Sequence, residues 1–178
     1  MDSILIRTLN GEKTSRPPVW FMRQAGRILP NYMQLKESFT FHELMNDKDL
    51  ASKVTLLPIE DLNVDAAILF SDILVIPHAL GLDVEFKKTG PIFNNPLNYS
   101  SKTADLEFDS SKLNYIYNNI KQVKLDKNQN TPLIGFCGGP LTVFLFMFKR
   151  DGSKDHIKKA IKYLYENREE SKKILELI

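Results

Sequence analysis

Two arginines and one aspartate stand out in the sequence because each follows an apolar run. Arg23 and Arg27 lie four residues apart behind VWFM, residues 19–22, and Asp72 follows AAILF, residues 66–70. A guanidinium is permanently charged and fork-shaped, which suits two-point binding of a carboxylate or a phosphate. A carboxylate at the mouth of an apolar strand can hold a cation, an N–H donor or a proton. These residue types predict a site for an anionic ligand.

Each of these features also has a plain structural interpretation. An R-x-x-x-R pair is more often a solvated or salt-bridged surface feature, and Asp72 can simply cap the next helix. Gly26, between the arginines, lets the backbone come close to a ligand. For GFCGGP, residues 135–140, a tight turn with close helix–strand packing is favoured over direct contact with a ligand.

The elements that must position these residues alternate between strands and helices. Continuous apolar runs predict buried strands at 66–70 and at LIGF, 133–136, and Pro17 and Pro18 favour a short strand at VWFM. This alternation implies βα units and a parallel sheet, whose functional residues gather at the carboxyl ends of the strands. Capping signals and apolar spacing predict helices at Asn31–Glu37, from Phe41, from Asp49 with a kink or end at Pro58, at 111–125, and from about Ser153 with Ile157, Ala160, Ile161 and Leu164 on one face.

Composition limits the class of protein. The chain has 178 residues, 43% of them apolar and 26% charged, which predicts one globular domain over 1–178 with 1–17 as a flexible arm. A net charge of +2 favours neither a nucleic-acid partner nor a membrane surface. Cys137 is the single cysteine, so we expect a buried, unpaired thiol in a reducing compartment, and therefore a cytoplasmic protein.

Several common site chemistries lack their sequence signature. His42, His78 and His156 share no metal-ligand spacing with one another or with Cys137, so no metal site is predicted. The chain has no G-x-G-x-x-G, no GK[ST] loop and no G-x-S-x-G elbow, which removes the usual support for nucleotide cofactors and serine hydrolysis.

Longer motifs carry a resemblance to a known family. WFMRQAGRILPNY, DAAILFSDILVIPHALGL, GPIF and PLIGFCGGPLT resemble the amino-terminal half of the uroporphyrinogen decarboxylases. Members of that family are single-domain TIM barrels that dimerise and use no metal or organic cofactor. The resemblance therefore implies an α/β fold, a (β/α)8 barrel truncated to roughly its first half. It also implies removal of the four acetate carboxyl groups of uroporphyrinogen III, which gives coproporphyrinogen III in haem biosynthesis.

The resemblance also assigns roles to residues. The family's substrate-binding MRQAGR falls on Met22–Arg27, which implies that Arg23, Arg27 and the residues between them bind substrate: Gln24, Ala25 and Gly26. The family's essential FSD aspartate falls on Asp72. The resemblance thus implies catalytic roles for Asp72, Arg23 and Arg27, with the small-molecule substrate uroporphyrinogen and no cofactor.

The chain departs from the family pattern at several positions. Most members have tyrosine at Ile28, an acidic residue near Asn31 and tryptophan at Leu141, and Phe146 takes the place of a substrate-contacting tyrosine. The family's carboxyl-terminal serine and histidine have no counterpart. Half a barrel has unpaired sheet edges, which favours a homodimer or pairing with a second chain that supplies the missing half. The alternative is an inactive porphyrinogen-binding or interaction module. A related methyltransferase branch ranks lower, because MRQAGR and FSDIL favour the decarboxylases.

Overall fold

A computed structural model describes residues 3–87, 90–152 and 154–178. The chain divides into two compact units, each built from two stretches of sequence. Unit 1 takes in the chain up to Ser71 together with Tyr115–Phe136, and unit 2 consists of Asp72–Asn114 and Cys137–Ile178. That the chain forms a single domain stays a prediction. No helix in the described ranges is long and apolar enough to cross a membrane.

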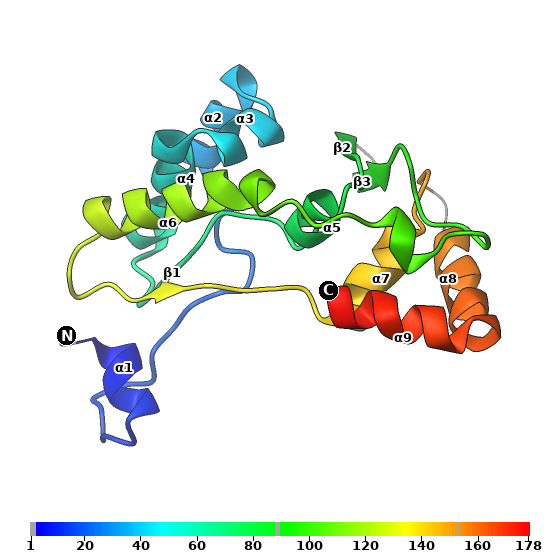
Figure 1. Cartoon of the computed structure of the whole chain (residues 1–178). Helices are drawn as coiled ribbons and strands as arrows, with labels where there is room; N and C mark the ends of the chain where they lie inside the picture. The colour runs from blue at the N-terminus through cyan, green and yellow to red at the C-terminus, as the bar shows by residue number, and fades with distance from the viewer. Residues whose placement is uncertain (1–2, 88–89, 153) are drawn as a thin grey trace. The chain divides into compact units, whose positions relative to one another are not determined.

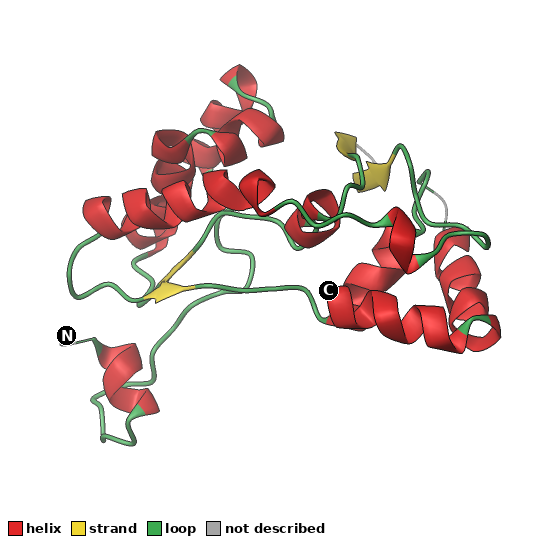
Figure 2. Ribbon diagram, in the orientation of Figure 1, coloured by secondary structure: helices red, strands yellow, loops and turns green. Residues whose placement is uncertain are grey.

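Unit 1 is mainly helical, with one pair of very short strands (Figures 1 and 2). Strand β1 (Ala67–Ile68) pairs in parallel with β4 (Leu133–Ile134), in the register Ala67 opposite Leu133. The predicted parallel sheet is thus confirmed to the extent that these two runs pair in parallel over two residues each. Five helices complete the unit: α1 (Ile4–Leu9), α2 (Pro30–Ser38), α3 (Phe41–Asn46), α4 (Lys48–Leu62) and α6 (Asn114–Asp126).

The capping signal for α3 is confirmed, and of the two outcomes predicted at Pro58, a kink or an end of the helix, the end is wrong. The Thr40 hydroxyl accepts the Glu43 N–H at 3.2 Å and the Glu43 carboxylate accepts the Thr40 N–H at 2.7 Å, which is the predicted capping box at the start of α3. Helix α4 begins behind Asp47, whose carboxylate caps it, and it continues through Pro58 to Leu62. Proline has no N–H, so Pro58 donates no hydrogen bond within the helix, yet the helix continues beyond it.

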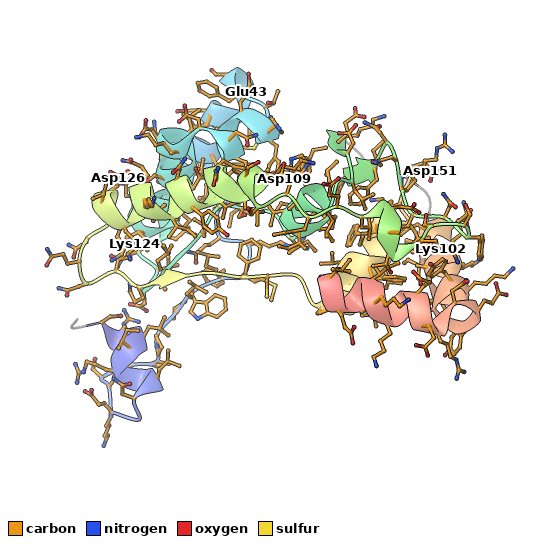
Figure 3. All side chains as sticks on the ribbon, viewed as in Figure 1. Glu43, Lys102, Asp109, Lys124, Asp126 and Asp151 are labelled. Atoms are coloured by element: carbon orange, nitrogen blue, oxygen red, sulfur yellow. The ribbon has the colours of Figure 1, made fainter. Side chains whose placement is uncertain are left out.

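Side chains from α4 and α6 join the two helices. The Ser52 hydroxyl donates to Asp126, which lies with Lys124 near the end of α6, at 2.6 Å (Figure 3). The buried Asn119 donates to the main-chain oxygen of Met45 at 2.7 Å. These bonds fix α6 against the helices that precede β1.

Of the strand predictions in unit 1, that for VWFM is wrong and that for LIGF is confirmed only in part. VWFM, residues 19–22, forms no strand: Val19 exchanges main-chain and side-chain bonds with Asp65 and the chain then turns at Met22 and Arg23. LIGF forms a two-residue strand that is only half-buried, and Phe136 is 47% exposed. Residues 66–70 are buried as predicted. An apolar run does not by itself guarantee burial, because apolar atoms make up much of the surface of any folded protein.

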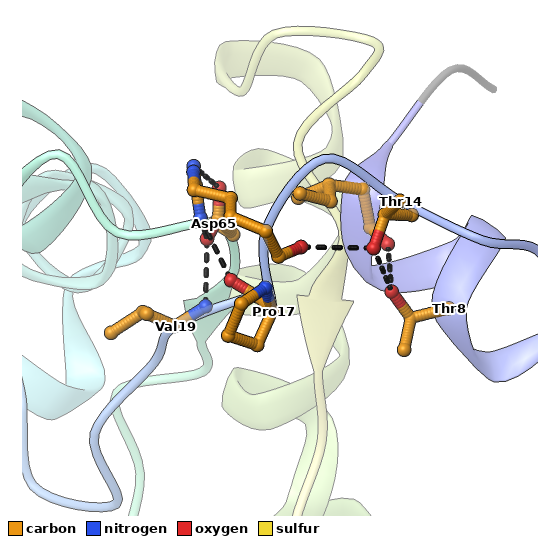
Figure 4. Close-up of polar contacts among 7 residues, drawn as sticks. Thr8, Thr14, Pro17, Val19 and Asp65 are labelled. Atoms are coloured by element: carbon orange, nitrogen blue, oxygen red, sulfur yellow. Dashed lines mark hydrogen bonds and ion pairs between the residues drawn. The ribbon is translucent and has the colours of Figure 1, made fainter.

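The segment expected as an arm, 1–17, contains α1 and a chain of hydrogen bonds between its side chains and its backbone. The hydroxyls of Thr8 and Thr14 lie 3.4 Å apart, and Thr14 donates to the main-chain oxygen of Arg16 at 2.9 Å (Figure 4). Whether this segment is flexible stays a prediction.

In unit 2 the last three helices and a β-hairpin pack around an apolar core. Phe144, Tyr163 and Ile174, one from each helix, are fully buried. The Tyr163 hydroxyl donates to the main-chain oxygen of Ser101 at 2.7 Å, which joins the helices to the loop before them. The elements are α5 (Val75–Ala79), β2 (Val84–Lys87), β3 (Gly90–Phe93), the 3-10 turns η1 (Thr103–Asp105) and η2 (Ser110–Leu113), α7 (Pro140–Met147), α8 (Asp155–Glu166) and α9 (Arg168–Leu177).

Two features of unit 2 differ from expectation. The antiparallel pairing of β2 with β3 is not among the predicted elements. The last predicted helix is two helices, α8 and α9, and its buried face is different: Ala160 and Tyr163 are buried, whereas Ile157 and Ile161 are 38% and 42% exposed. The predicted start at Ser153 lies outside the described residues.

Candidate functional site

The predicted arginines lie on one loop of unit 1, residues 19–29, which we call the arginine loop. The Gln24 N–H donates to the Phe21 carbonyl at 3.1 Å, and the Leu29 N–H donates to the Gly26 carbonyl at 3.0 Å, so two successive turns carry Arg23 and Arg27. Both arginine side chains are exposed, and within the described ranges neither forms an ion pair. The two guanidinium groups are therefore available to an external anion.

Gln24 differs from the arginines in that its side chain is buried. It is only 1% exposed, its amide donates to the main-chain oxygen of Ala66 at 2.8 Å, and its side-chain oxygen accepts the Phe21 N–H at 3.1 Å. Both ends of the amide are thus used inside the protein. The side chain links the loop to the residue before β1.

A second link holds the start of the same loop. The Arg16 guanidinium donates to both carboxylate oxygens of Asp65, at 2.6 and 2.7 Å, and the Val19 N–H donates to Asp65 at 2.7 Å (Figure 4). The Asp65 N–H returns a bond to the Val19 carbonyl at 2.8 Å. The hydrogen-bonded Arg16 guanidinium lowers the pKa of Asp65, so this carboxylate is ionised at neutral pH. Sequence reasoning missed Arg16 and Asp65; the signal was an aspartate directly before a buried apolar run.

Gly26 lies close to the backbone of its own loop. A Cβ at this position would lie 3.3 Å from the Arg23 carbonyl oxygen, which is tighter than an ordinary contact. The close approach is to the chain's own backbone. Ala25 beside it is half-buried.

Arg27 acts on a neighbour in the same unit. Burial raises the pKa of the Tyr32 hydroxyl, and the positive charge of Arg27 opposes that rise. Tyr32 also packs edge-on against Phe70, with ring centroids 6.1 Å apart. Through the contact of Tyr32 with Phe70, the helix that follows the arginine loop packs against the end of the apolar run 66–70.

Asp72 opens unit 2 and is half-buried. Its carboxylate accepts the Leu74 N–H at 2.6 Å, just before α5. Burial raises the pKa of Asp72, and the Leu74 hydrogen bond opposes this rise. A poorly hydrated carboxylate interacts more strongly with a nearby cation or N–H donor than one in water does.

The glycines after β4 divide into two kinds. A Cβ at Gly138 would overlap Val143 and lie 3.1 Å from the Cβ of Ile73, whereas at Gly139 the nearest atom would be 3.9 Å away. Gly138 thus packs directly against the residue that follows Asp72, which agrees with the close-packing interpretation of GFCGGP. Cys137 is exposed, so the prediction of a buried thiol is wrong: the chain leaves the short β4 before reaching it.

The predicted site residues belong to two different units. Arg23, Gln24 and Arg27 share one loop of unit 1, and Asp72 belongs to unit 2. Their convergence on one cavity stays a prediction. Within the described ranges no three histidine, cysteine, aspartate or glutamate residues are grouped so that they could hold a metal ion.

Comparison with known proteins gives consistent results. The sequence profile of the uroporphyrinogen decarboxylase (URO-D) family matches residues 2–178. The chain is 45% identical over 166 residues to a uroporphyrinogen decarboxylase of Campylobacter jejuni, covering 91% of this chain and 48% of that protein. It is 44% identical over 168 residues to that of Helicobacter pylori, covering 93% and 49%. For that of Christiangramia forsetii the identity is 42% over 156 residues, covering 86% and 46%.

A solved structure shares the fold. A methyltransferase from Methanosarcina mazei superimposes with a TM-score of 0.74 at 18% identity, covering 98% of this chain and 52% of that chain. This likeness concerns the fold alone. The chain spans about half the length of the curated relatives it matches. With its mixed α/β fold and a profile match over residues 2–178, the chain belongs to the uroporphyrinogen decarboxylase family.

Proposed function

We propose that this chain supplies the substrate-binding and catalytic groups of a uroporphyrinogen decarboxylase. Arg23 and Arg27 bind substrate carboxylates, the backbone of Ala25 and Gly26 shapes the loop between them, and Asp72 binds the pyrrole N–H groups. The reaction removes the four acetate carboxyl groups of uroporphyrinogen III and yields coproporphyrinogen III. The observation that supports this best is a pair of exposed arginines without ion-pair partners in the described ranges, on a loop anchored by the buried Gln24.

The surroundings of the arginines suit the substrate. Met22 and Ile28, which flank the two arginines, are 81% and 71% exposed. Uroporphyrinogen has carboxylates at its rim and apolar pyrrole faces within it. Guanidinium groups pair with the rim, while apolar side chains contact the rings. The loop thus offers both kinds of contact.

The chemical step needs positive charge on a pyrrole ring. The ring is protonated first, because the electron pair left when CO2 departs must flow into an electron-poor ring. Asp72 accepts hydrogen bonds from the pyrrole N–H groups and stabilises that cation. Because Asp72 is half-buried, its carboxylate is poorly hydrated, which raises its pKa. Such a carboxylate gains more from a developing positive charge than a solvated one does.

The rest of the fold belongs to this proposal too. We infer a (β/α)8 barrel of which this chain forms about half, with the other half in the remainder of a longer chain, in a second copy or in a second polypeptide. The enzyme would act as a cytoplasmic homodimer without a cofactor. The short β1–β4 pair supports this inference, because two paired residues per strand leave a sheet with much unpaired edge.

A second candidate is a porphyrinogen-binding module without activity. It is favoured by Phe146, which brings no hydroxyl where the family has a substrate-contacting tyrosine. This module would bind uroporphyrinogen through Arg23, Arg27 and Asp72 and release no CO2.

One experiment separates the two candidates. The purified chain is incubated anaerobically with uroporphyrinogen III, alone and with a candidate second half, and coproporphyrinogen is measured by chromatography after oxidation. The decarboxylase proposal expects product that disappears in Asp72→Asn, while Glu107→Gln, an exposed carboxylate of unit 2, serves as the matched control. Binding without product in every mixture supports the module. If the chain shows neither binding nor product, both candidates are contradicted.

A further inference from the structure

We propose that Gln24 and Asp65 are positioning residues, which clamp the arginine loop to the start of β1 and thereby fix Arg23 for a polycarboxylate ligand; the ligand part of this inference rests on the proposed function. On the β1 side the clamp uses two consecutive residues, Asp65 and Ala66. Asp65 holds the loop at Val19 and Ala66 holds it at Gln24.

The geometry closes the loop at both ends. Val19 and Asp65 exchange two bonds of 2.7 and 2.8 Å, and the Gln24 amide reaches Ala66 at 2.8 Å. Between these anchors the Phe21 N–H donates inward to the Gln24 side-chain oxygen at 3.1 Å. Arg23 directly precedes Gln24, so the bonds that hold the buried Gln24 side chain also restrict the backbone of Arg23.

The residue type at position 24 follows from these bonds. The side chain must donate to a main-chain carbonyl and accept from a main-chain N–H at the same time, and it must do so while 1% exposed. A glutamine amide has both functions, whereas an ionised glutamate only accepts and would repel the Ala66 oxygen. A buried polar group that loses its partner is costly. Gln24→Glu therefore breaks the clamp while changing little in size.

A fixed loop improves binding through entropy. A long cationic side chain on a mobile loop must be ordered when the ligand binds, and that ordering lowers affinity. The clamp orders the backbone of Arg23 beforehand. Gln24 thus acts through Arg23 and does not touch the ligand with its side chain.

The test is a double-mutant cycle with uroporphyrin as the probe, bound to the purified chain and followed by its fluorescence. Gln24→Glu and the apolar Gln24→Met, which fills the buried site, should each weaken binding about 10-fold, the equivalent of one hydrogen bond. In an Arg23→Ala background the same changes should have almost no further effect. Additive losses would mean that Gln24 contacts the ligand or acts elsewhere, and they would overturn the proposal.

A second readout needs no ligand. Trypsin cleaves after arginine, so the rate of cleavage after Arg23, measured by mass spectrometry, reports how often the loop opens. Gln24→Glu, Gln24→Met and Asp65→Asn should speed this cleavage by about 10-fold or more. Cleavage after Lys36, in α2, serves as the internal control for global unfolding and should not change. Unchanged cleavage after Arg23 overturns the clamp. If wild-type protein fails to bind uroporphyrin but the cleavage rates change as expected, the proposed function fails and the clamp stands.

Asn31→Ala is the matched control variant for both readouts. It removes an exposed hydrogen bond to Asp61, of 2.7 Å, in the helix that follows the loop. Neither uroporphyrin affinity nor cleavage after Arg23 should respond. If Asn31→Ala changed the affinity or the cleavage rate as much as the Gln24 variants do, any local weakening of unit 1 would be enough to cause these effects. That result would overturn a specific role for Gln24.

Discussion

The Arg16 guanidinium binds both oxygens of the Asp65 carboxylate, at 2.6 and 2.7 Å, across 49 residues of sequence. The Asp65 side chain is 11% exposed and that of Arg16 is 51% exposed, so the pair is sheltered on one side only. Because the same carboxylate also accepts the Val19 N–H, it links three stretches of unit 1: the segment before the arginine loop, the loop itself and the entry to β1.

Asp65→Asn should therefore destabilise unit 1. Asparagine can still accept the Val19 N–H, but it cannot form the charged two-point pair, so we expect a loss of about 1–2 kcal/mol in the free energy of unfolding. Trp20, the single tryptophan, lies next to Val19 and gives a fluorescence signal for urea unfolding. Glu12→Gln breaks the exposed pair with Arg7 and is the control, expected near zero. Equal effects of the two changes would contradict this prediction.

The contribution of Asp65 should also depend on pH. The pKa of Asp65 is lowered in the folded protein, so its stabilisation is complete above the ordinary pKa of aspartate and is lost as the pH falls through the folded pKa. The difference in unfolding free energy between wild type and Asp65→Asn should be constant from pH 7 to about 5 and should shrink below about pH 4. A difference that grows on acidification would contradict this assignment.

The two glycines before α7 should respond differently to alanine. Gly138→Ala forces a methyl group into Val143 and Ile73, which should cost about 1–3 kcal/mol, whereas Gly139→Ala has room and should change stability by a few tenths of a kcal/mol. Urea unfolding followed by far-UV circular dichroism measures both. If Gly138→Ala were as stable as Gly139→Ala, the close packing of Gly138 on Ile73 would be refuted.

Asp72→Asn should weaken function without weakening the fold. Because burial raises the pKa of Asp72, the folded protein holds this proton more tightly than the unfolded chain, and ionisation above that pKa lowers stability. Asparagine can still accept the Leu74 N–H. At pH 7 the free energy of unfolding of the variant should therefore be at least as high as that of the wild type. Under the proposed function, coproporphyrinogen formation should fall by about 10²-fold or more. A destabilised variant would mean that Asp72 is chiefly structural.

Glu170 should make the stability of unit 2 sensitive to acid. The Thr103 N–H, Lys173 and the Thr103 hydroxyl all bind its carboxylate, and together they lower the pKa of Glu170 to about 2. Its stabilisation is therefore complete above about pH 4.5 and is lost progressively as the pH falls toward 2. Thermal unfolding should show Glu170→Gln less stable than wild type at pH 7, with the gap narrowing as the pH falls from about 4.5 toward 2. Glu166→Gln, which breaks an exposed pair with Lys162, should show no such closing gap.

The local elements of this protein are easier to predict from its sequence than their packing. The Thr40–Glu43 capping box and the helix at 111–125 are predicted by sequence signals that lie close together in the chain, and both are confirmed. The apolar character of VWFM and LIGF predicts strands, yet strand formation needs a neighbouring strand to bond with. In the described residues the bonds of VWFM go to Asp65 and to Gln24 of its own loop. The burial predicted for Ile157 and Ile161 fails for a related reason: a helix stripe shows which side chains are apolar, but not which face its neighbours cover.

The site shows the same division. Residue type and motif make Arg23, Arg27 and Asp72 candidates, which stay predictions, and the close packing predicted for GFCGGP is found at Gly138. The motif also groups Gln24 with the substrate ligands, although its side chain is buried. Asp65 and Arg16 could not be paired from sequence, since nothing within either short stretch states a contact 49 residues away.

The exposure of Cys137 provides a practical probe. It is the single thiol of the chain, and it lies between β4 and the glycine that packs on Ile73. A maleimide fluorophore will therefore attach at one known position, with no cysteine to remove or introduce beforehand. Its emission, recorded while a tetrapyrrole is titrated in, would report energy transfer to the ligand, and hence its distance from this end of the strand, in the native sequence.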